Sequence, residues 1–92
     1  MAELIRVKCT GGDLVITDRE IAIELKRPFG GGLIRRDSII RAAITGQNAK
    51  THVTNGFVDF TFSGAGKQLV AKLIKPADAQ RVQAILDETP PA

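Results

Sequence analysis

Reactive side chains are scarce in this 92-residue chain, which has one histidine and one cysteine. His52 falls in the polar phase of a short predicted strand and has no paired nucleophile, which indicates a surface residue rather than a general base. Cys9 shares the apolar phase of Ile5 and Val7, so it is predicted to be a small buried hydrophobe; thiolate chemistry needs a polar and accessible setting. One cysteine and one histidine cannot form a zinc site unless several carboxylates converge on them. We therefore predict no catalytic residue, no metal site and no cofactor, and we expect that the protein is not an enzyme.

The acidic and glycine-rich segments give no sign of a catalytic or nucleotide site. The aspartates are scattered among predicted turns and strand starts, where an aspartate commonly hydrogen-bonds to its own backbone. Three successive glycines, Gly30 to Gly32, invite a comparison with phosphate-binding loops. They lack the Gly-x-x-x-x-Gly-Lys-Ser/Thr pattern and are predicted to lead into a strand rather than a helix, so a nucleotide site is not expected.

The strongest candidate for a binding site is a basic segment. Residues 26–41 carry five cations and one carboxylate, Asp37, and thus a net charge of +4, whereas the whole chain has a net charge of +3. Such local charge concentrates the electrostatic potential. We predict that an anionic ligand would bind here, with Arg35 and Arg36 as hydrogen-bond donors to a phosphate group and Phe29 as an apolar contact. The alternative is a solvated loop whose Phe29 folds back over the end of the sheets. The candidate ligand-binding residues are Lys26, Arg27, Phe29, Arg35, Arg36 and Arg41.

Two classes of anionic partner are compatible with this segment. A flexible loop with an apolar tip and flanking arginines suits anionic lipid head groups or phosphates, and each cation near such a surface contributes about 1 kcal/mol. Binding of single-stranded nucleic acid relies on exposed aromatic side chains that stack on bases. The chain has no Trp or Tyr, and two of its four phenylalanines, Phe60 and Phe62, fall in an apolar phase. Weak nucleic-acid binding by a small barrel therefore ranks below lipid binding.

Self-assembly is the first expectation. The predicted sheet edges lie at residues 51–54, or at Ile39 and Ala43 on a second face, and they carry little of the charge that usually protects an open edge. Pairing of such edges between copies would give a two-fold dimer or a closed ring. We therefore expect a homo-oligomer or a complex with another protein, with an anionic membrane surface as the alternative partner.

The elements that must position these residues are mostly strands, because apolar and polar residues alternate with a period of two along most of the chain. Residues 27–32 are predicted to be the longest loop, since Pro28 lacks a backbone donor and the glycines lose much entropy on ordering. Turns are predicted at residues 46–48 and at Asn55-Gly56, a strong signal for a two-residue hairpin. Strands are predicted at residues 5–9, 13–17, 20–26, 38–45, 49–54, 57–63 and 67–75.

A single helix is predicted at residues 76–86. Apolar residues recur there at helical spacing from Ala79 to Leu86, and Pro76 suits the first turn because its missing N–H has no partner there. Seven antiparallel strands and one amphipathic helix that plugs an open end predict a mainly β sandwich or barrel.

The length of the chain suits one domain, predicted at residues 1–88, with a disordered tail at residues 89–92. A lone cysteine and the lack of a basic and apolar leader favour a reducing, cytoplasmic compartment. No apolar run approaches the roughly 20 residues of a membrane-spanning helix, so membrane contact is expected only at the periphery.

Two motifs resemble those of a known family. Thr17-Asp18-Arg19 forms a turn between two predicted strands, and residues 34–39 read Ile-Arg-Arg-Asp-Ser-Ile. With the C-terminal helix, this pattern resembles bacterial PH-like (pleckstrin-homology-like) domains, in which a Thr-Asp-Arg turn and a later Ile-x-x-x-(Asp or Ser)-Ile strand opening tend to recur. The resemblance covers roughly residues 3–86. It implies a PH-like sandwich or barrel that is a small binding or assembly module without catalysis, some of whose members self-associate.

Overall fold

The structure is a computed structural model and describes residues 2–30 and 32–90. This part of the chain contains seven β-strands, one turn of 3-10 helix and one α-helix. The first four strands are β1 (Glu3–Cys9), β2 (Gly12–Thr17), β3 (Glu20–Lys26) and β4 (Leu33–Ile40). They are followed by the 3-10 turn η1 (Arg41–Ala43), the strands β5 (Ile44–Thr51), β6 (Val58–Gly64) and β7 (Lys67–Ile74), and the helix α1 (Pro76–Glu88).

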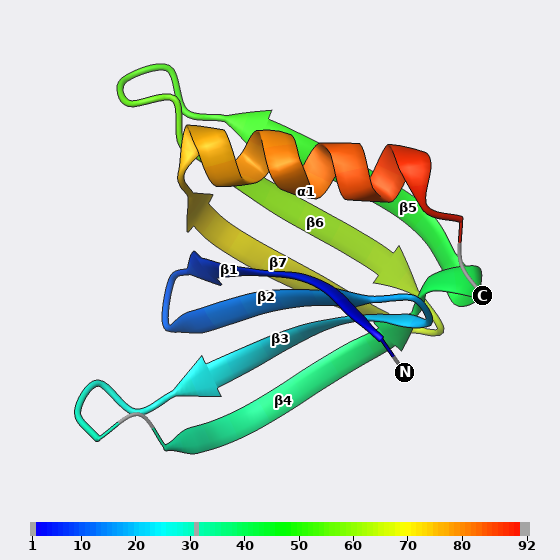
Figure 1. The fold of residues 1–92 in the computed structure, drawn as a ribbon, viewed down its shortest axis with the longest axis horizontal. Helices are drawn as coiled ribbons and strands as arrows, with labels where there is room; N and C mark the ends of the chain where they lie inside the picture. Colours follow the sequence, from blue (N-terminus) through cyan, green and yellow to red (C-terminus); the bar gives the residue numbers. More distant parts are fainter. Residues whose placement is uncertain (1, 31, 91–92) are drawn as a thin grey trace.

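The strands form two antiparallel sheets. One has the order β1-β2-β3-β4 and the other has the order β5-β6-β7, so that neighbours in each sheet are also neighbours in the chain (Figure 1). The predicted mainly β architecture with a single C-terminal helix is therefore confirmed. The sheets do not close into a barrel: over residues 2–30 and 32–90, β1 and β4 end one sheet, and β5 and β7 end the other. Of the two predicted arrangements, the sandwich is the one that matches.

The core lies between the two sheets. Ile5 and Val7 of β1 point into it, as their alternation predicts, and Cys9 packs at its margin. Phe60 and Phe62 of β6 are almost completely buried, and their stacked rings have centroids 6.1 Å apart. Large aromatic side chains contribute much of the buried apolar area in a domain of this size. The centre of the fold is therefore built around β6.

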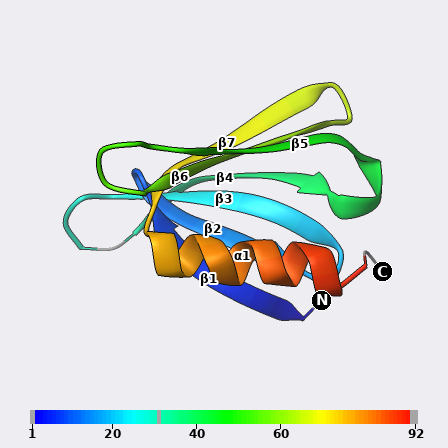
Figure 2. The ribbon, with the colours of Figure 1, turned by 90° about the horizontal axis from the view of Figure 1, so that it is seen from above.

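The helix α1 completes the core on one side. It lies beside β1 and crosses in front of the second sheet (Figures 1 and 2). Ala79 and Val82 are buried against the sheets, and Ile85 and Leu86 are partly buried. Pro76 stands at the start of the helix, where a proline costs no hydrogen bond. The apolar stripe that the sequence predicts is thus the face that packs.

The middle of the chain differs from the prediction. The strand predicted at residues 38–45 and the turn at residues 46–48 are wrong, because β4 ends at Ile40 and residues 44–51 form one strand that pairs with β6. The chain changes direction at η1, where the backbone N–H of Arg41 donates to the carbonyl oxygen of Arg19 over 2.8 Å. The prediction missed the first part of β4, residues 33–37. These are two apolar residues followed by three charged ones, so they lack the alternation that indicates a strand.

The predicted two-residue hairpin at Asn55-Gly56 is also wrong. Residues 52–57 connect β5 to β6, and Gly56 in this loop has a φ of 75°. The tight turn of the second sheet is Ala65-Gly66, between β6 and β7, with φ values of 52° and 75°, and it confirms the turn that the sequence predicts at residues 64–66. Two successive positive φ angles match the right-handed twist of the strands that such a turn joins.

Candidate functional site at the β3–β4 hairpin

The loop between β3 and β4 projects from the body of the protein (Figure 1). Its closing contact is the hydrogen bond from the backbone N–H of Arg27 to the carbonyl oxygen of Gly32, 2.8 Å long. Phe29 is 91% exposed, Leu33 is 55% exposed and Ile34 is 62% exposed. We call Arg27, Phe29, Leu33 and Ile34 the hairpin tip. Phe29 does not fold back over the sheets, so the predicted alternative of a tucked-in aromatic is wrong.

The cations at the base of the hairpin are engaged by carboxylates. Lys26 Nζ lies 2.7 Å from Asp13 Oδ2, and Arg35 Nε lies 2.9 Å from Asp37 Oδ2. A cation that is already paired with a carboxylate has less charge to offer to a phosphate group. The predicted site is therefore much less basic than the sequence of residues 26–41 suggests.

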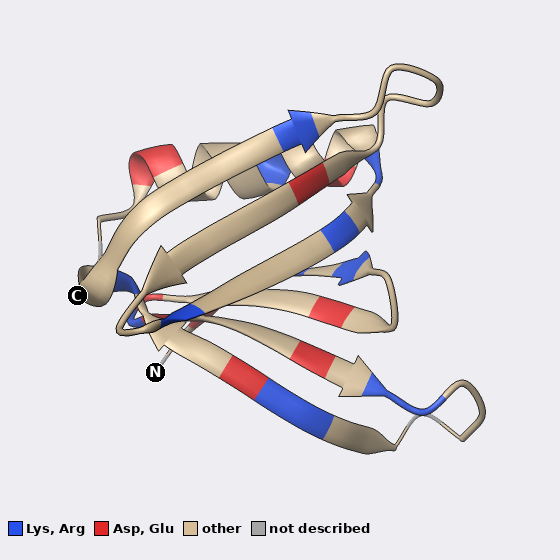
Figure 3. Ribbon diagram, turned by 180° about the vertical axis from the view of Figure 1, so that it is seen from behind, with Lys and Arg blue, Asp and Glu red and all other residues tan. Residues whose placement is uncertain are grey.

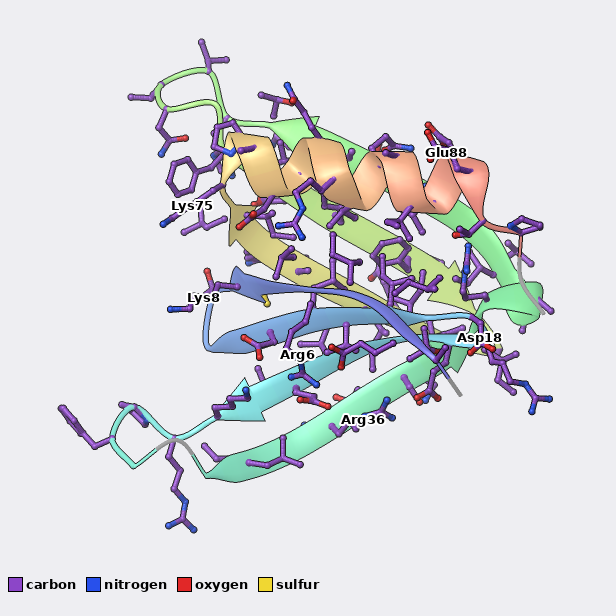
Figure 4. The ribbon with its side chains drawn as sticks, viewed as in Figure 1. Arg6, Lys8, Asp18, Arg36, Lys75 and Glu88 are labelled. Carbon is purple, nitrogen blue, oxygen red and sulfur yellow. The ribbon has the colours of Figure 1, made fainter. Side chains whose placement is uncertain are left out.

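Arg36 is engaged as well. It forms ion pairs with Glu20 and Glu24 of β3, which raise the pKa of its guanidinium group. Its side chain lies on the outer face of the first sheet, and Glu24 is bound both by Arg36 of β4 and by Arg6 of β1 (Figure 4). The sequence predicts that Arg36 binds phosphate, but in the structure its guanidinium group is part of a network of ion pairs within the chain.

Arg6 is the centre of this network, and sequence analysis did not single it out. Its Nη1 atom lies 3.0 Å from Asp13 Oδ2 and 2.7 Å from Glu24 Oε1, and its Nη2 atom lies 2.9 Å from Glu3 Oε1. The hydrogen bond from Arg6 lowers the pKa of Glu24, with a smaller contribution from Arg36. Burial acts to raise the pKa of Asp13, but the hydrogen bonds from Lys26 and Arg6 outweigh it and lower that pKa. The outer face therefore holds ionised groups of both signs in contact.

The network also covers apolar surface. Val15 and Ala22 point to the outer face, yet they are almost completely buried. Because no other strand or helix is paired over this face in the described part of the chain, long charged side chains such as those of Arg6 and Arg36 provide the cover. Figure 3 shows acidic and basic positions side by side across the first sheet, without a continuous basic patch.

Arg41 is separated from the other predicted site residues. It lies in η1, beyond the end of β4 that is remote from the hairpin tip, and only 7% of its surface is exposed. Its guanidinium group donates to the carbonyl oxygen of Thr17 over 3.2 Å and to that of Thr89. The structure thus groups Arg27, Phe29 and Arg35 near the hairpin and removes Arg41 from them.

β4 is an open edge of the first sheet and carries exposed apolar residues. Ile40 is 63% exposed, almost the same as Ile34. The pairing of Ile40 with Glu20 and of Arg36 with Glu24 places these side chains on the outer face. Sequence analysis proposed Ile39 as the edge residue, but Ile39 points into the core and is buried. We call β4 and its residues Ile34, Arg36, Ser38 and Ile40 the open β4 edge.

His52 has a structural partner. Its Nε2 atom lies 3.0 Å from Asp59 Oδ2, and Asp59 Oδ1 accepts the backbone N–H of Leu73 over 2.8 Å. Leu73 has a φ of 59°, an unusual value for a branched side chain, at a register shift between β6 and β7. The Leu73 N–H, followed by His52, lowers the pKa of Asp59 against the opposing effect of burial. This trio holds the β5–β6 loop and the bulge in place.

The remaining groups that could do chemistry are isolated. Cys9 is partly buried, and burial, together with the nearby charge of Asp13, raises the pKa of its thiol to about 11, so it is protonated at neutral pH. Among residues 2–30 and 32–90, no three His, Cys, Asp or Glu side chains gather as a metal site would require. Of the four phenylalanines, only Phe29 is exposed, whereas Phe57 is half-buried and the other two are in the core. This distribution gives no support to base stacking by a row of aromatic side chains.

In the part of the chain that the structure describes, no helix is long and apolar enough to cross a bilayer. No family model, curated protein or solved structure matches this chain.

Proposed function

We propose that this chain is a non-catalytic, PH-like binding module that assembles with copies of itself through the open β4 edge. The observation that carries the proposal is the placement of Ile34 and Ile40, two exposed apolar residues of the same edge strand, each three positions from Asp37. An exposed edge strand has unpaired backbone donors and acceptors that can pair with a second strand. The two sheets with four and three strands and the C-terminal helix support the PH-like part of this proposal.

The sequence of β4 favours one register. When two copies pair antiparallel about a two-fold axis at Asp37, Ile34 of each copy lies opposite Ile40 of the other. Arg36 then lies opposite Ser38 and only diagonal to Arg36 of the other copy, and each Arg36 is paired with Glu20 and Glu24 of its own chain. An axis at Arg36 would set two arginines directly opposite each other, which is unfavourable.

The two Asp37 side chains meet at the proposed axis, on the opposite face from Ile40. Each is already paired with Arg35 of its own strand, at 2.9 Å. In this register Arg35 of one copy is also the diagonal neighbour of Asp37 in the other copy, within reach of a long side chain. The charge that would otherwise oppose pairing at the axis is thus compensated.

A charge-exchange experiment tests both the interface and its register. The variant Ile34→Lys/Ile40→Lys sets like charges opposite each other at both contacts and should sediment as a monomer at micromolar concentration. The variant Ile34→Lys/Ile40→Glu sets opposite charges there and should remain associated like the parent protein. Val53→Lys, at a fully exposed position in the β5–β6 loop, is the control and should not alter the sedimentation coefficient.

Three outcomes would contradict the proposal. The first is a parent protein that is a monodisperse monomer at micromolar concentration. The second is a Lys/Lys variant that sediments like the parent, and the third is a Lys/Glu variant that dissociates like the Lys/Lys variant. Melting temperatures close to that of the parent would show that each variant is folded, since exposed substitutions usually change stability by less than about 0.5 kcal/mol.

The hairpin tip favours a second candidate function, binding to anionic membrane surfaces. Phe29 and Leu33 are exposed apolar side chains on a projecting loop, and Arg27 and Arg35 flank them at exposed positions. Apolar side chains that enter the interfacial region, with cations at the level of the phosphates, are typical of peripheral binding. The engagement of Lys26, Arg35 and Arg36 by carboxylates leaves Arg27 as the cation of this hairpin that would contact phosphate.

Co-sedimentation with vesicles tests this candidate. Binding to vesicles with anionic phosphatidylglycerol should exceed binding to pure phosphatidylcholine and should fall as salt shortens the Debye length from about 10 Å at 0.1 M to about 3 Å at 1 M. Phe29→Asp and Arg27→Glu should each abolish the binding, whereas Val53→Asp in the β5–β6 loop of the other sheet should preserve it. Equal binding by Phe29→Asp and Val53→Asp would rule out the hairpin tip.

A further inference from the structure

Arg41 is a buried cation in an unusual setting. Its side chain reaches Thr89, the residue after α1, and donates to its carbonyl oxygen. It also reaches Thr17, the last residue of β2, and donates to its carbonyl oxygen. Thr89 also ends the helix through its N–H, which donates to the carbonyl oxygen of Ile85 over 3.0 Å. Arg41 therefore joins the helix to the first sheet at the point where the two sheets meet.

No carboxylate compensates this charge among residues 2–30 and 32–90. The cations in that part of the chain either form ion pairs with Asp or Glu or lie on the exposed surface, and Arg41 alone is buried without an ion pair. Burying a charge is costly unless it is paired, and two carbonyl dipoles compensate it only in part. A guanidinium group has five N–H donors in a fork that matches the two oxygens of a carboxylate.

A cavity of about 200 Å³ adjoins Arg41. Its walls are one cation, one amide and three aliphatic side chains. This composition suits a ligand with a negative head and a short apolar tail. The volume is below the roughly 300–1,000 Å³ of sites for drug-sized ligands, which limits the ligand to a small molecule. The lining residues are Ile21, Arg41, Ile44, Gln47 and Leu86.

From the buried guanidinium and the adjoining cavity we infer that this site binds a short-chain aliphatic carboxylate. The carboxylate would accept hydrogen bonds from Arg41 and from the amide of Gln47, and its alkyl chain would contact Ile44 and Leu86. A phosphate group fits less well, because it carries up to two negative charges and meets one arginine between aliphatic walls. Arg41 directly follows Ile40 of the open β4 edge, but none of the lining residues belongs to that edge or to the hairpin tip, so the inference does not depend on either proposal above.

Thermal unfolding with sodium butyrate as the probe tests the inference. At roughly five times its dissociation constant, butyrate at neutral pH should raise the Tm by about 4–8 °C relative to sodium chloride at equal ionic strength. Sodium phosphate at equal ionic strength should give no such rise. A direct titration of the parent protein with butyrate by calorimetry should show one site per chain.

The variant Gln47→Glu provides the decisive comparison. It places a carboxylate of the chain itself in the cavity that Arg41 also lines. Because this carboxylate would pair with Arg41, the variant should have a higher Tm without ligand and should not respond to butyrate. Gln83→Glu is the control: it adds a carboxylate to α1 in the wall of a separate groove, and although repulsion by Asp87 should lower its Tm slightly, its response to butyrate should equal that of the parent. This design avoids Arg41 itself, whose replacement would break the contact between the helix and the sheet.

The inference fails if butyrate raises the Tm of the parent no more than chloride does. It also fails if Gln47→Glu keeps the full response, since butyrate would then act elsewhere. A larger effect of phosphate than of butyrate would identify a phosphate site and reject the carboxylate assignment.

Discussion

Replacing Gly64 with alanine should lower the free energy of unfolding by about 3 kcal/mol or more, because the added methyl group has no space. A Cβ atom at this position would lie 2.2 Å from the carbonyl oxygen of Ala43 and 2.9 Å from the Cα atom of Ile44. Both are backbone atoms at the junction of η1 and β5, and they cannot turn aside as a flexible side chain would. Chemical denaturation followed by circular dichroism measures the loss.

Gly46 offers a matched control for this substitution. It lies on β5 near the same junction, and a Cβ atom there would lie 3.6 Å from the Cβ atom of Ser63, an ordinary van der Waals distance. Gly46→Ala should therefore change the free energy of unfolding by less than about 1 kcal/mol. If both variants lost the same stability, the close approach of β6 to η1 would not be the cause.

Replacing Phe62 with alanine should lower the free energy of unfolding by about 3–5 kcal/mol, because it removes a buried ring and leaves a cavity. Phe62 is completely buried and stacks on Phe60 with an interplanar angle of 5°. For a domain of this size the loss corresponds to a fall in Tm of at least about 12 °C. The total stability of small domains is about 5–15 kcal/mol, so this single change removes much of it.

Phe29→Ala is the control for the loss of a phenyl ring as such. Phe29 is 91% exposed, and its ring is not part of the core. The variant should unfold at the same denaturant concentration as the parent, while vesicle binding, if the hairpin tip acts as proposed, should fall. A loss of stability as large as that of Phe62→Ala would mean that Phe29 packs against the fold in solution.

The proposed sites lie on different parts of the molecule and can be tested separately. The open β4 edge is probed at Ile40, the hairpin tip at Phe29, and the cavity beside Arg41 at Gln47. Ile34 is the one residue that two proposals share, because it stands where the loop passes into β4. Charge exchange at Ile34 must therefore be assessed with vesicle binding as well as with sedimentation.

Sequence analysis succeeded where the signal is local. The strand at residues 20–26 has the predicted bounds, and the helix begins at Pro76 as predicted. In both segments the buried face is set by the spacing of apolar residues along one element, with a period of two in β3 and close to 3.6 in α1. The buried positions of Ile21 and Val82 follow from that spacing alone.

Sequence analysis failed where the environment of a residue is set by neighbours that are distant in the chain. It found the charges of residues 26–41 but not their partners, since Arg36 meets Glu20 and Lys26 meets Asp13 only after β2, β3 and β4 pair in register. These contacts convert a basic segment into a nearly neutral network, because an ion pair needs its two atoms within about 4 Å.

The amino-acid sequence by itself determined the mainly β architecture, the single terminal helix and the projecting loop, because each depends on periodicity or on backbone chemistry within a few residues. Only the tertiary structure decided which of the predicted site residues stand together. It exposed Phe29 at the hairpin tip, and it buried Arg41 beside a cavity whose walls come from β3, β5 and α1. The physical reason is that burial and ion pairing are set by the topology of the two sheets, which joins residues far apart in the chain.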